Sequence, residues 1–162
     1  MPFFALVDDD TLNARLDAFA GALGDALAAK AETLALALTE AVKLDKLSGQ
    51  ILAARSGALR DSIAAEVAAD GDTIVATVGS LGDLKYAAIQ EYGGKTSAHE
   101  ILPDKAKALA FAAGGAMRFA TRVEHPGSTI PGRSYLRATL EEQSDAIVAA
   151  LAATPQESWE RA

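Results

Sequence analysis

Residues 11–42, TLNARLDAFAGALGDALAAKAETLALALTEAV, set the architecture of the chain, because their apolar positions recur at steps of three, four and seven. Such steps place these side chains on one face of an α-helix that Asp10 or Thr11 can cap. Two leucine series repeat every eleven residues, which keeps an apolar stripe nearly straight along a helix. The stripe consists of Leu12, Leu16, Phe19, Leu23, Leu27, Leu34, Leu38 and Val42.

This helix is long for a chain of 162 residues. At about 1.5 Å per residue it spans roughly 48 Å, whereas a compact domain of this size is only about 40 Å across. The helix therefore either bends at Gly21 and Gly24 or offers part of its stripe to another subunit. In the second case residues 1–47 form a long helix that projects to neighbouring subunits.

The remaining segments indicate short helices, short strands and a second long helix. Apolar spacing predicts helices at residues 56–63 and 83–91, and from about Ser134 to the end of the apolar pattern. Alternation around the turn Asp70-Gly71-Asp72 predicts a β-hairpin. Further short strands are expected at residues 99–102, 108–111 and 118–123.

Two segments are expected to lack regular structure. The loop from His125 to Gly132 contains two Pro-Gly pairs, and residues 155–162 form a polar, loose tail. The sequence thus predicts one α+β domain over residues 1–162. A long N-terminal helix and a C-terminal helix pack on a small antiparallel sheet, with short helices between them.

Composition excludes several classes of protein. The net charge of −7 opposes bulk binding of nucleic acid, although residues 99–140 carry six bases against three acids. The chain has no cysteine, so it forms neither disulfides nor thiolate metal sites. No membrane-spanning apolar stretch and no basic signal leader is present. We expect a protein made in a cytoplasm, or carried in a particle assembled there.

No catalytic constellation stands out. His99 and His125 lack metal-ligand spacing, and their neighbours Glu100 and Glu124 would point to the opposite face of a strand. The Ser-Gly pairs do not form a nucleophile elbow, and the glycines lack the Lys-Ser/Thr of a phosphate loop. We therefore predict no enzyme and no catalytic, cofactor-binding or metal residues.

Two segments are candidates for contact with other chains. Tyr86 and Tyr92 flank a short helix that ends at Gly93-Gly94, and exposed tyrosines often anchor interfaces. A stiff loop then delivers Arg133 and Tyr135 to the start of the last helix. The tyrosines could equally close a small core, and the loop could be a plain connector.

An ordered set of motifs resembles the neck or tail-completion proteins of long-tailed bacteriophages, grouped with the virion-morphogenesis and minor-tail families. The resemblance covers roughly residues 45–150. Relatives often have proline at the position of Ser134. The matching segments are Ser56-Gly57 to Ile63, Tyr86-Ala87 to Gly94, Ile101 to Phe111, Val123 to Gly127, and Pro131 to Leu136, of which His125-Pro126-Gly127 with Arg133 to Leu136 is the most specific.

The resemblance implies a non-enzymatic structural protein of the virion, located at the neck, or head–tail connector, and needed for tail completion and head–tail joining. Such a protein acts by oligomeric assembly into a ring, a hexamer or dodecamer, made in the bacterial host cytoplasm. Its partners are copies of itself and head-closure, tail-terminator or tail-tube proteins. The implied contact or motif residues are Tyr86, Glu91, Tyr92, Gly93, His125, Pro126, Gly127, Arg133 and Tyr135.

If a ring forms around DNA, four bases could face its channel and touch DNA in transit without sequence preference. These bases are Lys105, Lys107, Arg118 and Arg122. Reversing their charges without harm to DNA passage or infectivity would remove this hypothesis.

Three alternatives remain open. A tail-terminator ring would cap the tail tube, although the His125-Pro126-Gly127 element argues against it. A small helical protein-binding module would be a monomer or dimer, absent from purified virions. A hydrolase would use His99 or His125, and full function of a His99→Ala, His125→Ala double variant would dismiss it.

Overall fold

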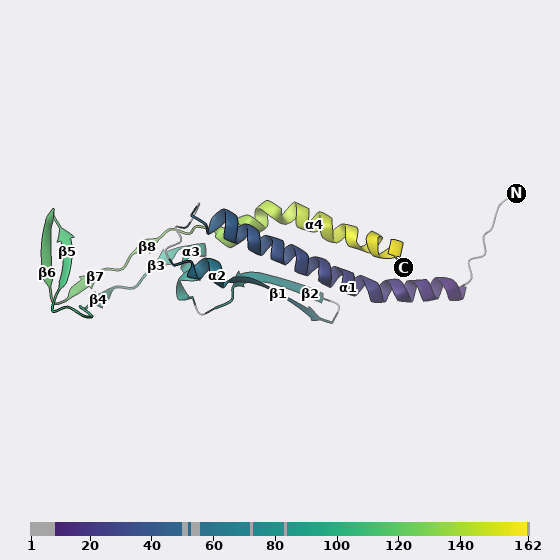
Figure 1. The fold of residues 1–162 in the computed structure, drawn as a ribbon, viewed down its shortest axis with the longest axis horizontal. Coiled ribbons are helices and arrows are strands. Elements are labelled where there is room, and N and C mark those ends of the chain that lie inside the picture. Colours follow the sequence, from purple (N-terminus) through teal and green to yellow (C-terminus); the bar gives the residue numbers. More distant parts are fainter. Residues whose placement is uncertain (1–8, 50–51, 53–55, 72, 83, 162) are drawn as a thin grey trace. The chain divides into compact units, whose positions relative to one another are not determined.

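The computed structural model describes residues 9–49, 52, 56–71, 73–82 and 84–161. The fold is α+β, with a long N-terminal helix, a C-terminal helix, and small antiparallel sheets and short helices between them (Figure 1). We expected one domain, but the contacts form two compact units: residues 1–84 with 135–162, and residues 85–134. The second unit arises because its strands pair only among themselves.

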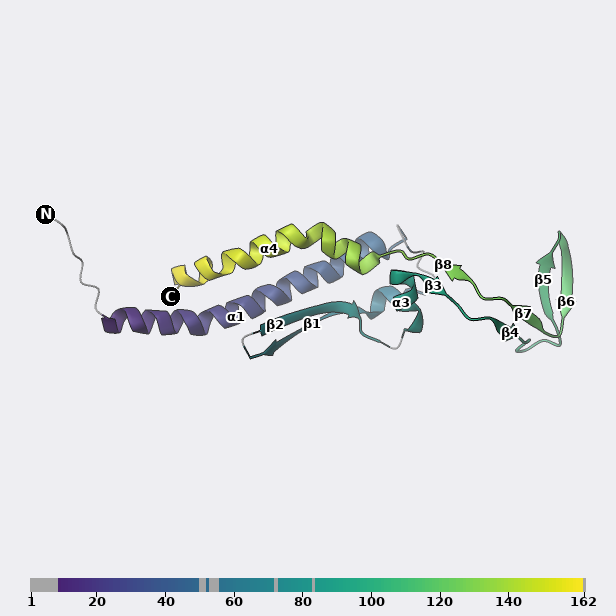
Figure 2. The ribbon, with the colours of Figure 1, turned by 180° about the vertical axis from the view of Figure 1, so that it is seen from behind.

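The first unit, hereafter the helical unit, is built around helix α1 (Asp9–Ala41), which continues as the π-helical turn η1 (Val42–Lys46). Helix α4 (Tyr135–Arg161) runs alongside α1 (Figure 2). No break occurs at Gly21 or Gly24, because the packing of a long helix outweighs the roughly 1 kcal/mol that each glycine costs. The stripe is buried at Leu38 but exposed near the start of the helix.

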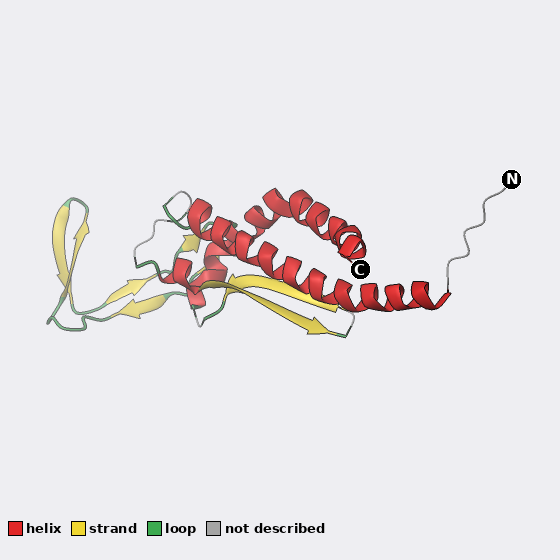
Figure 3. Ribbon diagram, turned by 45° about the vertical axis from the view of Figure 1, so that its right-hand side comes forward, coloured by secondary structure: helices red, strands yellow, loops and turns green. Residues whose placement is uncertain are grey.

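A β-hairpin covers another side of α1 (Figure 3). Strands β1 (Ile63–Asp70) and β2 (Thr73–Ser80) pair in antiparallel register from Ile63 opposite Ser80 to Asp70 opposite Thr73. Gly71 at the turn has φ +58°, which the tight hairpin turn requires and glycine adopts without strain. The predicted hairpin is confirmed. The short helix α2 (Ala58–Ser62) precedes it and ends one residue earlier than expected, because Ile63 already belongs to β1.

The core of the helical unit lies where η1, β1 and the start of α4 meet. Val42, Leu47, Ile63 and Tyr135 form it, and each is at most 2 % exposed. The Leu47 N–H donates to the Val42 carbonyl at 3.2 Å, five residues back. This wider turn lets both side chains face inward, which 3.6-residue spacing would not allow.

The expectation of a loose tail over residues 155–162 is wrong over the described part of that tail, because α4 continues to Arg161. Trp159 packs edge-on against Phe19 of α1 with ring centroids 5.4 Å apart. The Arg15 guanidinium lies 4.6 Å from the Trp159 ring, and Lys30 pairs with Glu157 at 3.5 Å. The polar composition of residues 155–162 does not predict these contacts, because the aromatic contact of this segment with α1 depends on a single tryptophan.

The second unit, hereafter the arm unit, contains helix α3 (Lys85–Tyr92) and three nested antiparallel strand pairs. The pairs are β3 (Gly94–Lys95) with β8 (Thr129–Ile130), β4 (His99–Ile101) with β7 (Val123–His125), and β5 (Leu109–Ala113) with β6 (Ala116–Ala120). The outgoing and returning segments thus pair along their length and end in the β5–β6 hairpin (Figure 1). This hairpin turns at Gly114-Gly115, where both glycines have positive φ.

Three strand predictions need correction. Instead of one small sheet, the described residues form four two-stranded sheets. The strand expected at residues 118–123 is two strands, β6 and β7, because each pairs with a different partner. The loop from His125 to Gly132 is not wholly irregular, since Thr129–Ile130 pairs with Gly94–Lys95.

Candidate interaction site

The end of α3 and the loop before α4 meet within the arm unit. Gly93 has φ +75°, and its N–H donates to the Ile89 carbonyl at 2.9 Å to end the helix. The Arg133 N–H donates to the Gln90 carbonyl at 2.8 Å, and the Ser134 N–H donates to the Glu91 carbonyl at 3.1 Å. These bonds join two segments that lie about forty residues apart in the sequence.

Glycine is needed where these segments touch. A Cβ atom on Gly93 would lie 2.6 Å from the Gly132 nitrogen, and one on Gly132 would lie 2.8 Å from the Tyr92 carbonyl carbon. Real Cβ atoms do not approach backbone atoms this closely. The Tyr92-Gly93 and Pro131-Gly132-Arg133 motifs therefore form the two sides of one backbone contact.

The His125-Pro126-Gly127 motif shapes a second backbone contact. The Gly127 N–H donates to His125 Nδ1 at 3.0 Å, and Gly127 has φ +85°. A Cβ on Gly127 would collide with the carbonyl oxygen of Thr96. The Ser128 N–H donates to Thr96 Oγ1 at 2.7 Å, and the Thr96 N–H returns a bond to the Ser128 carbonyl at 2.9 Å.

The two histidines come together, which the sequence could not show. His99 lies opposite His125 in the β4–β7 pair, and their rings stack with centroids 5.0 Å apart. His99 Nδ1 lies 3.1 Å from the Ser97 carbonyl, so this ring donates there, whereas His125 Nδ1 accepts from Gly127. Among the residues the structure describes, no group of three or more His, Asp or Glu side chains could hold a metal ion.

The contact candidates differ in exposure. Tyr92 is 74 % exposed and Tyr86 is 41 % exposed, as surface contacts require. Glu91 is buried, and Ser134 Oγ donates to its Oε1 atom at 3.4 Å. Tyr135 is a core residue of the helical unit and only 1 % exposed, so a role as an exposed contact is wrong for it.

The remaining candidates lie at the surface. Pro126 and Arg133 are exposed. Lys105 and Lys107 are exposed in the connection between β4 and β5, and Arg118 is exposed on β6. Arg122 differs from these bases, because it pairs with Glu100 at 3.4 Å and with Glu124 at 3.8 Å.

The sequence reasoning missed an exposed apolar hairpin, β5–β6. Phe119 is 73 % exposed, Met117 62 % and Phe111 36 %. Phe111 shares one face with Arg118, its cross-strand partner, whereas Met117 and Phe119 lie on the other face. Apolar residues on both sides of Gly114-Gly115 were the available signal, and we interpreted them only as strand formers.

Comparisons with known proteins identify no family for this chain. No protein-family model, curated protein or solved structure matches the chain. Within the described residues, no helix has both the length and the apolar character needed to cross a membrane. The guides to function are therefore the contacts and exposed surfaces of the chain itself.

Proposed function

We propose that this protein is a structural component of a phage virion, located at the neck between head and tail. In this proposal it acts without catalysis, by assembling with copies of itself and with neighbouring neck or tail proteins. Its loss would prevent tail completion and head–tail joining.

The observation that carries the proposal is the convergence of the motifs. The segments around His125-Pro126-Gly127 and Arg133 carry the most specific resemblance to the neck and tail-completion proteins, and the Tyr92-Gly93 segment belongs to the same ordered set. They meet in one unit, where glycines allow backbone contacts that other residues would block. Motifs whose residues fix a backbone scaffold, rather than a set of reactive groups, agree with a structural role.

The distribution of apolar residues favours assembly. Among the described residues, seven hydrophobic residues are buried, whereas fourteen large hydrophobic residues are exposed. Scattered exposed residues are ordinary on a monomer, but Phe111, Met117 and Phe119 cluster on one short hairpin. Partner chains would cover both faces of this hairpin in the assembled virion.

The test is deletion of the gene from the phage or prophage that encodes the protein. We expect lysates with DNA-filled heads beside unattached tails in electron micrographs, and recovery of infectious particles when purified protein is added. Complete, infectious particles without the protein would refute the proposal. Tails of irregular length would instead favour a tail terminator, because a tube without its cap continues to grow.

A matched pair of complementing proteins makes the test specific. Gly93→Val places a branched side chain against Gly132 and should fail to complement. Gly21→Val, on α1 where an added Cβ meets no atom within 4 Å outside the neighbouring helix backbone, should complement. Equal recovery by both proteins would show that the convergent motifs are not needed for joining.

A further inference from the structure

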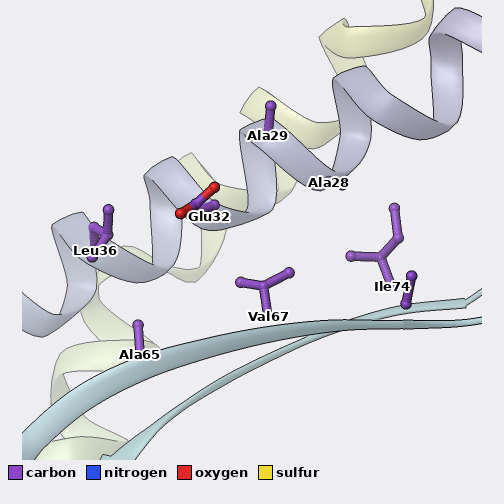
Figure 4. A pocket seen from close by; sticks show the side chains of 8 residues that line it. Ala28, Ala29, Glu32, Leu36, Ala65, Val67 and Ile74 are labelled. Carbon is purple, nitrogen blue, oxygen red and sulfur yellow. The ribbon is translucent and has the colours of Figure 1, made fainter.

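An open hollow lies between α1 and the β1–β2 hairpin of the helical unit (Figure 4). Its volume is about 420 Å³. The hollow is unfilled because small side chains surround it: four of its eight lining residues are alanines. The lining residues are Ala28, Ala29, Glu32 and Leu36 of α1, Ala65, Val67 and Ala69 of β1, and Ile74 of β2.

Glu32 is the one charged residue in this lining. It is exposed, and it makes no ion pair with any other described residue. An occupant that covered the hollow with apolar atoms alone would desolvate the carboxylate without a counter-charge, which is strongly unfavourable. A suitable occupant is therefore apolar with one cation.

One face of the β5–β6 hairpin has this chemistry. Phe111 and Arg118 are directly opposite each other in the strand pair and share that face. Arg118 is exposed and, like Glu32, forms no ion pair with another described residue. The opposite face, with Met117 and Phe119, offers no charge to meet the carboxylate.

The net charges of the two units match this pairing of a cation on the arm unit with a carboxylate on the helical unit. Residues 85–134 carry seven bases and four acids, whereas the rest of the chain carries eight bases and eighteen acids. The arm unit of one copy is thus attracted to the helical unit of another. Opposite net charges steer two such surfaces together and disfavour arm-to-arm contact.

We infer that the β5–β6 hairpin of one copy seats in the α1–β1–β2 hollow of a second copy, with Phe111 against its apolar wall and Arg118 paired with Glu32. The contact joins two different surfaces, so it is heterologous and propagates from copy to copy into a closed ring or an open filament. It rests on the assembly role proposed above, and it names the surfaces that meet.

The experiment exchanges the two charges in the full-length protein. Arg118→Glu alone and Glu32→Arg alone each oppose like charges, so each variant should lose self-association in native mass spectrometry and sedimentation velocity. We expect the apparent dissociation constant to rise about 30-fold or more. The double variant, Glu32→Arg with Arg118→Glu, should recover association.

Mixing the two single variants tests whether the contact joins different copies. The new carboxylate of the Arg118→Glu variant then meets the new guanidinium of the Glu32→Arg variant, and the native pairing forms at the reverse contact. The mixture should therefore assemble into complexes that alternate between the two variants, while each alone stays dissociated. A contact made within one chain predicts no rescue on mixing, and that result would overturn the inference.

Matched controls carry the same charge changes outside the contact. Glu66→Arg lies on β1 with its side chain on the strand face opposite the lining residues Ala65 and Val67, and Lys107→Glu lies in the connection before β5. Both should associate as the wild type does. If the wild type associates and the Arg118→Glu and Glu32→Arg variants associate equally well, this interface is rejected but self-assembly is not. A wild type that stays monomeric at all concentrations would reject the interface together with the self-assembly part of the proposed function.

Discussion

Phe19→Ala tests whether the end of α4 is anchored on α1. The substitution removes the edge-to-face contact with Trp159, worth about 0.5–1.5 kcal/mol. It also removes the apolar burial of the half-buried Phe19 ring, for about another 1 kcal/mol. Alanine favours helix, so α1 itself should persist. The expected loss is about 2 kcal/mol, or about 4–8 °C in the unfolding midpoint of a chain this size.

The assay can report from the contact itself, because Trp159 is the one tryptophan in the chain. We expect its emission to shift to longer wavelength in Phe19→Ala, together with a lower midpoint by circular dichroism. Leu16→Ala is the control, since Leu16 is 44 % exposed on the same helix and should change stability by less than about 0.5 kcal/mol. Unchanged emission and an unchanged midpoint in Phe19→Ala would refute the docking of α4 on α1.

Three further substitutions probe the core and the backbone contacts. Tyr135→Ala should cost about 3–5 kcal/mol in denaturant unfolding, because the ring is fully buried. Gly127→Ala should speed amide hydrogen exchange around Thr96 and Ser128 while leaving exchange in α1 unchanged, because the added Cβ meets the Thr96 carbonyl. Ser134→Pro should lower the unfolding midpoint, because φ is +37° there and proline would remove the N–H that bonds to Glu91; an unchanged midpoint would contradict this reasoning.

Local patterns predicted the elements that local physics controls. The apolar stripe of α1 and the β1–β2 hairpin both follow from spacing that repeats within a few residues. The end of helix α3 at Gly93 could also be predicted, because glycine adopts the left-handed conformation that ends a helix without strain. Fold class could therefore be predicted from the sequence alone.

Long-range pairing could not be predicted in the same way. His99 meets His125 through strand pairing across twenty-six residues, and no spacing rule contains that register. Trp159 anchors the polar end of α4 through contacts with residues about 140 positions away. The hollow beside Glu32 depends on which alanines of α1 and β1 face each other, and no local pattern specifies that pairing.

The π-helical turn at Val42–Lys46 also governs how the length of α1 can change. This turn holds one residue more than an α-helical turn, so a one-residue deletion in it would bring Val42 and Leu47 to i,i+4 spacing, and an ordinary α-helix would keep both side chains facing the core. Upstream, an insertion of about seven or about eleven residues returns to within roughly 20° of the same angle after two or three turns, whereas an insertion of about five or about nine residues rotates the stripe away from α4 and β1. Natural variation in the length of this helix is therefore expected in steps of about seven or eleven residues upstream, or as loss of the one extra residue of the π turn.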